Sequence, residues 1–111
     1  MTNVAFTAGT FWLIVEATFK SEADLATFQD AFKTLSDYVS KNEPNTLTYQ
    51  VAKSDKDPLK VVIVERYLTK DDYLNVHRTS QPFLKFRPIL HALGPTISGN
   101  SYYGLEGVGF V

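Results

Sequence analysis

The sequence predicts an α+β domain of the ferredoxin-like type, with the element order β-α-β-β-α-β and both helices on one face of an antiparallel sheet. Two observations lead to this prediction. An apolar first strand precedes a long amphipathic helix, and two strands, a second helical region and a closing strand follow it. The 111 residues suit a single domain with its own core.

The first strand is expected over residues 11–20, FWLIVEATFK, because β-branched and aromatic residues dominate this segment. Its apolar residues point to both faces, so we expect burial on both sides. Residues 1–10 are expected to form an N-terminal arm, and residues 11–111 the ferredoxin-like domain.

The first helix is expected over residues 21–40, where apolar residues recur at spacings of three and four. Ser21 and Asp24 have the spacing of a capping box, and Pro44 disfavours helix in the residue before it. The apolar stripe of this helix consists of Leu25, Phe28, Phe32, Leu35 and Val39.

A hairpin is expected next, with strands over 46–53 and 59–68 joined by the turn-forming segment SDKDP. The first of these strands alternates in polarity. The residues predicted to share its apolar face are Leu47, Tyr49 and Val51.

Two helical segments and a strand complete the expected order. A helix over roughly 70–79 begins with the capping pair Thr69 and Asp72. A second segment, 80–95, carries Pro88, which should kink or restart the helix. Its apolar face comprises Phe83, Phe86, Leu90 and Leu93. The last strand is expected over 101–111, weakened by three glycines.

Composition and charge exclude several classes of function. The net charge is −1 without a basic stripe, which argues against a nucleic-acid partner. No cysteine is present, so thiol chemistry and thiolate metal sites are excluded, and the two histidines are too far apart to suggest a metal site. No apolar run suggests a membrane span, and the N-terminus does not resemble a signal peptide, so a cytoplasmic protein is expected.

The sheet face turned away from the helices also carries apolar residues in the strands 11–20 and 59–68. A large apolar face is rarely left in contact with water. A symmetric homodimer with the two sheets face to face is the simplest closed solution, so a second copy is the expected partner.

Three segments resemble the antibiotic biosynthesis monooxygenase family: NEPNTLTYQV (42–51), VIVERYLTKDDYLNVHRTSQPFLKF (62–86) and GLEGVGF (104–110). The second is the most specific. The residues at family-like spacing within it are Glu65, Tyr67, His77, Ser80 and Phe83. The resemblance implies a dimeric α+β barrel. The family that the chain resembles includes cofactor-independent monooxygenases of polyketide-derived aromatics, haem-degrading enzymes and isomerases of small metabolites.

Two departures from the family pattern bear on function. Asn45 replaces the glycine expected after Glu43-Pro44, a mild change because asparagine also tolerates a positive φ. The haem-degrading members carry a tryptophan at the position of His77 and a histidine near that of Arg87. Haem degradation is therefore set aside.

His77 is the main candidate for acid–base chemistry, because histidine is the side chain that ordinarily changes charge near neutral pH and because it shares a helix face with Tyr73. The alternative is a structural histidine bonded to a strand carbonyl or to Glu65. Glu65 lies in an apolar strand and is expected to pair with His77 or to contact the substrate directly. The alternative is an ion pair with Arg78 or Arg87 across the dimer.

The expected catalytic set is thus His77, Glu65 and Tyr49, with no metal and no cofactor. Pocket walls that would bind a small aromatic substrate are expected from Tyr67, Trp12, Tyr73, Phe83, Phe86 and Leu90, although a plain core role is an alternative for the apolar ones. The favoured function is a cofactor-independent monooxygenase. The alternatives are an isomerase or lyase of a small carbonyl metabolite and a non-enzymatic, dimeric ligand-binding protein.

Overall fold

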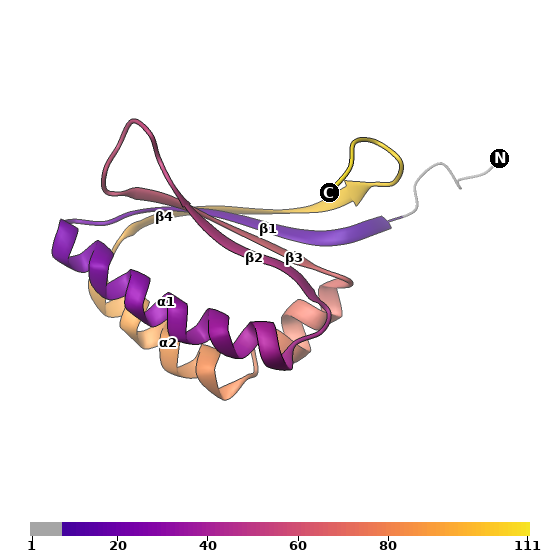
Figure 1. Cartoon of the computed structure of the whole chain (residues 1–111), viewed down its shortest axis with the longest axis horizontal. Helices are drawn as coiled ribbons and strands as arrows, with labels where there is room; N and C mark the ends of the chain where they lie inside the picture. The colour runs from indigo at the N-terminus through magenta and orange to yellow at the C-terminus, as the bar shows by residue number, and fades with distance from the viewer. Residues whose placement is uncertain (1–7) are drawn as a thin grey trace.

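The computed structural model describes residues 8–111. Figure 1 shows an antiparallel sheet with the helices packed on one face. The elements are β1 (Ala8–Thr18), α1 (Glu22–Asn42), β2 (Thr46–Lys53), β3 (Lys60–Tyr67), η2 (Asp72–His77), α2 (Gln81–Leu93) and β4 (Thr96–Leu105). The strand order is β2-β3-β1-β4, and every pairing is antiparallel. The predicted α+β class and the β-α-β-β-α-β order are confirmed.

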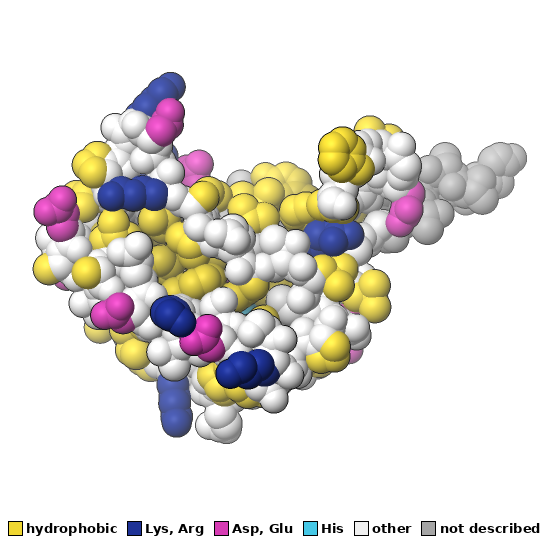
Figure 2. All heavy atoms as spheres, viewed as in Figure 1, with side chains coloured by type: hydrophobic (Ala, Val, Ile, Leu, Met, Phe, Trp, Pro, Cys, Tyr) yellow, Lys and Arg dark blue, Asp and Glu magenta, His cyan; other side chains and the backbone are white. Residues whose placement is uncertain are grey.

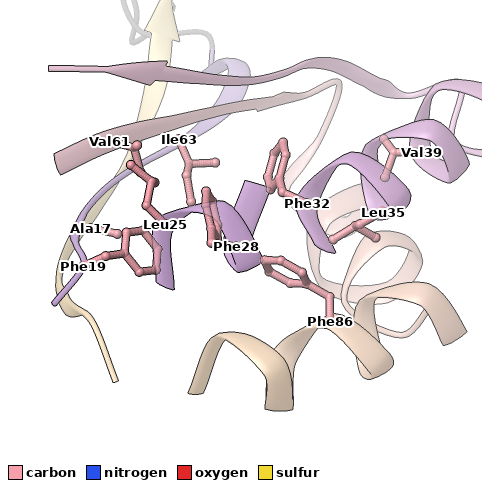
Figure 3. Close-up of a cluster of buried hydrophobic side chains, with 10 residues drawn as sticks. All are labelled: Ala17, Phe19, Leu25, Phe28, Phe32, Leu35, Val39, Val61, Ile63 and Phe86. Atoms are coloured by element: carbon pink, nitrogen blue, oxygen red, sulfur yellow. The ribbon is translucent and has the colours of Figure 1, made fainter. Parts of the chain in front are cut away.

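Helix α1 begins where the capping signature places it. The Ser21 hydroxyl accepts a hydrogen bond from the Asp24 N–H at 3.1 Å, which satisfies one of the free donors of the first turn. The helix continues to Asn42, two residues beyond the expected end, and its predicted apolar stripe is buried. Figure 3 shows the side chains of this stripe packed toward β3 and toward Phe86 of α2. The core therefore lies between the sheet and the two helices.

Strand β1 begins at Ala8, so residues 8–10 of the predicted arm lie in the strand, and residues 1–7 fall outside the described part of the chain. The strand register shifts between Ala8 and Phe11. There a Cβ on Gly9 would lie 2.5 Å from the carbonyl oxygen of Gly104. Glycine at this position permits the close approach of the two strands.

The predicted last strand, 101–111, is wrong at both ends. Strand β4 covers Thr96–Leu105 and pairs with β1 along most of its length. Its first half, TISGN, contains residues typical of turns, and only pairing with β1 makes it extended. Beyond the strand, Gly107 and Gly109 have φ values of 75° and 80°, which turn the chain away from the sheet.

The predicted face of β2 is correct for Tyr49 and Val51 and wrong for Leu47. The pairing with β3 shifts between Thr46 and Thr48, so Leu47 is the extra residue of a bulge and is 42% exposed. A bulge cannot be recognised from alternation, because alternation assumes an unbroken register.

The predicted helix 70–79 is a shorter π-helix, η2, in which the Arg78 N–H donates to the carbonyl of Tyr73, five residues earlier, at 3.0 Å. The reciprocal bonds between Thr69 and Asp72 precede it as expected. Helix α2 runs through Pro88, so of the two predicted outcomes, a kink or a restart, the restart is wrong. Pro88 is exposed, so the helix carbonyl that loses its N–H donor there can bond to water. None of the helices over residues 8–111 is long and apolar enough to cross a membrane.

Candidate functional site

A cluster of polar side chains lies inside the layer between sheet and helices, at the end of the sheet where β3 finishes. Its members, called the polar cluster below, are Glu43, Tyr49, Glu65, Tyr67 and His77. They come from the end of α1, from β2 and β3, and from η2. His77 and Tyr67 are 0% exposed, and Glu43 and Glu65 are 4% and 8% exposed. Carboxylates at this depth are costly unless they are paired.

His77 pairs with Glu43 and not with Glu65, which corrects the expected pairing. The distance from His77 Nδ1 to Glu43 Oε1 is 3.0 Å, and the Thr46 hydroxyl donates to the same oxygen at 2.8 Å. A proton on Nδ1 that donates to the carboxylate leaves Nε2 as an acceptor in the neutral imidazole. His77 Nε2 and Glu43 Oε2 are buried and have no hydrogen-bond partner among residues 8–111.

Glu65 accepts a hydrogen bond of 2.6 Å from the Tyr67 hydroxyl, and the expected ion pair with Arg78 or Arg87 across the dimer stays a prediction. Burial raises the pKa of Glu65, while the Tyr67 bond and the neighbouring His77 act in the opposite direction. Glu65 therefore takes up a proton more readily than an exposed glutamate.

The two tyrosines of the polar cluster stay protonated, and the Tyr67 hydroxyl donates to Glu65. Burial, followed by the nearby carboxylate of Glu65, raises the pKa of both Tyr49 and Tyr67 well above its usual value. The Tyr49 ring stacks on Phe32 at 4.8 Å and meets the His77 ring edge-on at 5.0 Å. Tyr49 thus packs between the apolar core and the histidine.

A cavity of about 390 Å³ lies beside this cluster, between η2, α2 and the start of β4. Its apolar and aromatic walls are Tyr73, Phe83, Phe86, Leu90 and Ile97. Arg78 and Arg87 complete the lining. The volume falls in the range of small-ligand pockets, about 300–1,000 Å³, and an apolar wall with few polar groups is typical of such sites.

The cavity and the polar cluster meet at two aromatic rings. The His77 ring lies 5.0 Å from that of Phe83 and 6.3 Å from that of Tyr73, and both of these line the cavity. His77 itself is fully buried and does not line the cavity. The histidine is therefore separated from any bound molecule by Tyr73 and Phe83.

The structure brings together most of the predicted site residues. Tyr73, Phe83, Phe86 and Leu90 line the cavity, whereas Tyr67 belongs to the polar cluster. Trp12 is the exception, because it lies on the opposite face of the sheet, with the Arg66 guanidinium 5.5 Å from its ring. Residues of β1 alternate between faces, and buried Phe11 points to the helices, so its neighbour Trp12 points away.

Sequence reasoning missed Glu43 as a partner of His77. One signal could have found it, since the apolar stripe of α1 ends at Val39, and the next position on the same face is residue 43. A carboxylate on the buried face of a helix requires a partner. Ile97 was missed because its segment was not assigned to a strand. No group of three or more His, Asp or Glu side chains within 8–111 could hold a metal ion.

Comparisons with known proteins agree with the fold. The model of the family "Antibiotic biosynthesis monooxygenase" matches residues 10–88. A solved structure from Nitrosomonas europaea, described as belonging to the antibiotic biosynthesis monooxygenases, has 25% identity and a TM-score of 0.80, over 94% of this chain and 98% of that one. A similarly described protein from Caulobacter crescentus has 22% identity and a TM-score of 0.80, over 94% and 96%.

SnoaB, a cofactor-independent oxygenase from Streptomyces nogalater, has 14% identity and a TM-score of 0.75, over 91% of this chain and 98% of that one. At this identity the likeness shows the fold alone. No curated protein matches the sequence. The family match spans more than half of the chain and includes Glu43, Glu65 and His77, so the chain belongs to the antibiotic biosynthesis monooxygenase family.

Proposed function

We propose that the protein is a monooxygenase that oxidises a small, electron-rich aromatic molecule with dioxygen and needs neither a flavin nor a metal. The family supports the reaction class. The observation that carries the proposal is the aromatic-walled cavity of about 390 Å³ that adjoins a buried histidine–carboxylate pair. The first provides a place for an aromatic ring, and the second provides a proton acceptor close by.

The substrate must supply all the electrons in such a reaction. When a hydroxyarene becomes a quinone, one oxygen atom of dioxygen enters the product and the other leaves as water, so four electrons come from the ring. An ionised hydroxyarene gives up its first electron more readily than a neutral one. The protein then has to bind the ring, exclude water and take up a proton.

Tyr73 is the residue we place in contact with the substrate, because its side chain lines the cavity and its ring adjoins His77. The Glu43 carboxylate selects the tautomer of His77 that leaves Nε2 as the proton acceptor. His77 lies behind the rings of Tyr73 and Phe83 and receives the substrate proton when one of these rings moves aside. Glu65 and Tyr49 border His77 from the sheet and complete the site.

Dioxygen uptake in the presence of hydroxynaphthalenes and anthrones tests the function directly. We expect uptake above the uncatalysed rate, one ¹⁸O atom from labelled dioxygen in the product, and no effect of a metal chelator. Tyr73→Phe should reduce the rate, and Tyr38→Phe, in a helix away from the cavity, should not. Uptake equal to that of the buffer across the panel would refute the proposal.

We also propose that two copies pair through the sheet face that the helices leave uncovered. The apolar side chains on this face are Trp12, Ile14, Val62, Val64 and Tyr102. In Figure 2 hydrophobic side chains appear along this upper side of the sheet and in the hollow between helices and sheet, with charged groups dispersed around them. Val64→Glu should halve the mass measured by light scattering, and Leu84→Glu, on the helical side, should leave it unchanged.

One observation favours a second candidate, a dimeric binding protein without turnover. His77 is fully buried, as expected of a structural histidine. Tight binding of aromatic molecules without any dioxygen uptake would support this candidate. A change in kcat for His77→Gln with an unchanged ligand affinity would contradict it.

A further inference from the structure

Two positive side chains line the otherwise apolar cavity. Arg78 follows η2, with its guanidinium 5.7 Å from the ring of Tyr73, and Arg87 comes from α2. The ion pairs found within residues 8–111 are Lys33–Asp37, Lys60–Glu16 and His77–Glu43. Neither arginine has a carboxylate oxygen within 4.0 Å in that part of the chain. Two cations therefore face one cavity without a counter-charge.

The other charged groups near the cavity do not cancel the positive charges of the two arginines. Glu65 is the carboxylate that acts on Tyr73, but it is bonded to the Tyr67 hydroxyl, and burial raises its pKa. Burial and Glu65 raise the pKa of Tyr73, whereas Arg78 and Arg87 act in the opposite direction. Both guanidinium groups thus create a positive potential at a side chain of the cavity wall.

We infer that the cavity binds an aromatic carboxylate, with its acid group held by Arg78 and Arg87 and its ring against Phe83, Phe86 and Leu90. A guanidinium group binds a carboxylate through paired N–H donors, which gives both energy and orientation. The aromatic walls contact the flat faces of the ring. The inference rests on the proposed function for the reaction and adds the charge of its substrate.

The test compares 2-naphthoate with 2-naphthamide, a neutral molecule of the same shape, by titration calorimetry at pH 7.5. The wild-type protein should bind the acid about tenfold more tightly than the amide. This preference should shrink as sodium chloride is added, because salt screens charges that solvent can reach.

Variants assign the preference to the two arginines. Arg78→Gln and Arg87→Gln should each weaken naphthoate binding about three- to tenfold and leave naphthamide binding unchanged. Arg87→Lys should retain part of the preference, because the charge remains without the planar fork. Lys85→Gln is the matched control, because it removes the same charge as the arginine variants. Lys85 is exposed on the same helix as Arg87 and does not line the cavity.

The inference is overturned if naphthoate does not bind, if naphthamide binds as tightly, or if Lys85→Gln has the same effect as the arginine variants. It can fail separately from the proposed function. Selective binding of naphthoate without dioxygen uptake by hydroxynaphthoates would keep the anion site and reject the monooxygenase. Equal dioxygen uptake with neutral naphthols and with hydroxynaphthoates would keep the monooxygenase and reject the anion site.

Discussion

The layer between sheet and helices has two ends that are equally buried and chemically opposite. At one end Phe19, Phe28 and Val61 form an apolar cluster, with Phe28 only 1% exposed. At the other end lies the polar cluster, in which His77 is 0% exposed. The same two long elements, α1 and β3, contribute to both ends.

The difference shows that the fold gains stability at the apolar end and loses some at the polar end. Burial of apolar surface stabilises a protein by about 25 cal/mol per Å², whatever the partner. A buried polar atom costs about 1–3 kcal/mol when it lacks a hydrogen bond, and this end holds two such atoms, His77 Nε2 and Glu43 Oε2. Buried polar atoms without partners lower stability, and such exceptions are typical of functional sites.

The largest effect is expected at the apolar end. Phe28→Ala should lower the free energy of unfolding by about 3–5 kcal/mol, because the ring contacts Phe19, Phe32 and Phe86 and its loss leaves a cavity. Urea denaturation at pH 5.5 and pH 8 should give the same loss, since no titrating group is involved. A loss that depends on pH would show that the two ends are coupled.

At the polar end, His77→Ala should cost about 3 kcal/mol at pH 7, mainly because Glu43 loses its buried partner. Adding Glu43→Gln should recover part of this loss, since the amide needs no counter-charge. A double-mutant cycle measures the coupling, expected at about 1–3 kcal/mol. Additive losses would mean that the pair contributes only by packing.

Glu65→Gln should stabilise the protein at pH 8 by about 1–2 kcal/mol, because burial disfavours the carboxylate while glutamine can still accept the Tyr67 bond. The pKa of Glu65 is raised in the folded chain, so its contribution to stability is complete below the usual value of 4.5 and is lost as the pH rises through the folded pKa. The gain should therefore be smaller at pH 5 than at pH 8. Glu106→Gln, at an exposed site, is the control.

The smallest effects on the free energy of unfolding are expected at two helix caps, one at the apolar end of the layer and one at the polar end. Ser21→Ala and Ser80→Ala should each cost about 1 kcal/mol, because each hydroxyl accepts an N–H of its helix. The Ser80 hydroxyl also donates to the carbonyl of His77 at 3.0 Å. Thermal unfolding should show a slightly larger loss for Ser80→Ala, and equal losses would mean that this second bond contributes nothing.

Local sequence signals predicted much of the fold. The spacing of apolar residues in α1, the caps at Ser21 and Thr69, and the inward positions of Tyr49 and Val51 in β2 depend on neighbours in the chain, and the structure confirms them. The Gly94-Pro95 stop also holds, since α2 ends at Leu93. The aromatic walls of the cavity from α2 followed from the same helical spacing.

Only the tertiary structure decided the rest. The first half of β4 is extended because β1 pairs with it, and Leu47 is exposed because a bulge shifts the register of β2. The partner of His77 is Glu43, which lies 34 residues away in the chain and reaches the histidine only when the end of α1 packs beside η2. Spacing along a chain determines which residues share a face, whereas the contacts between faces depend on register and packing, which no local pattern contains.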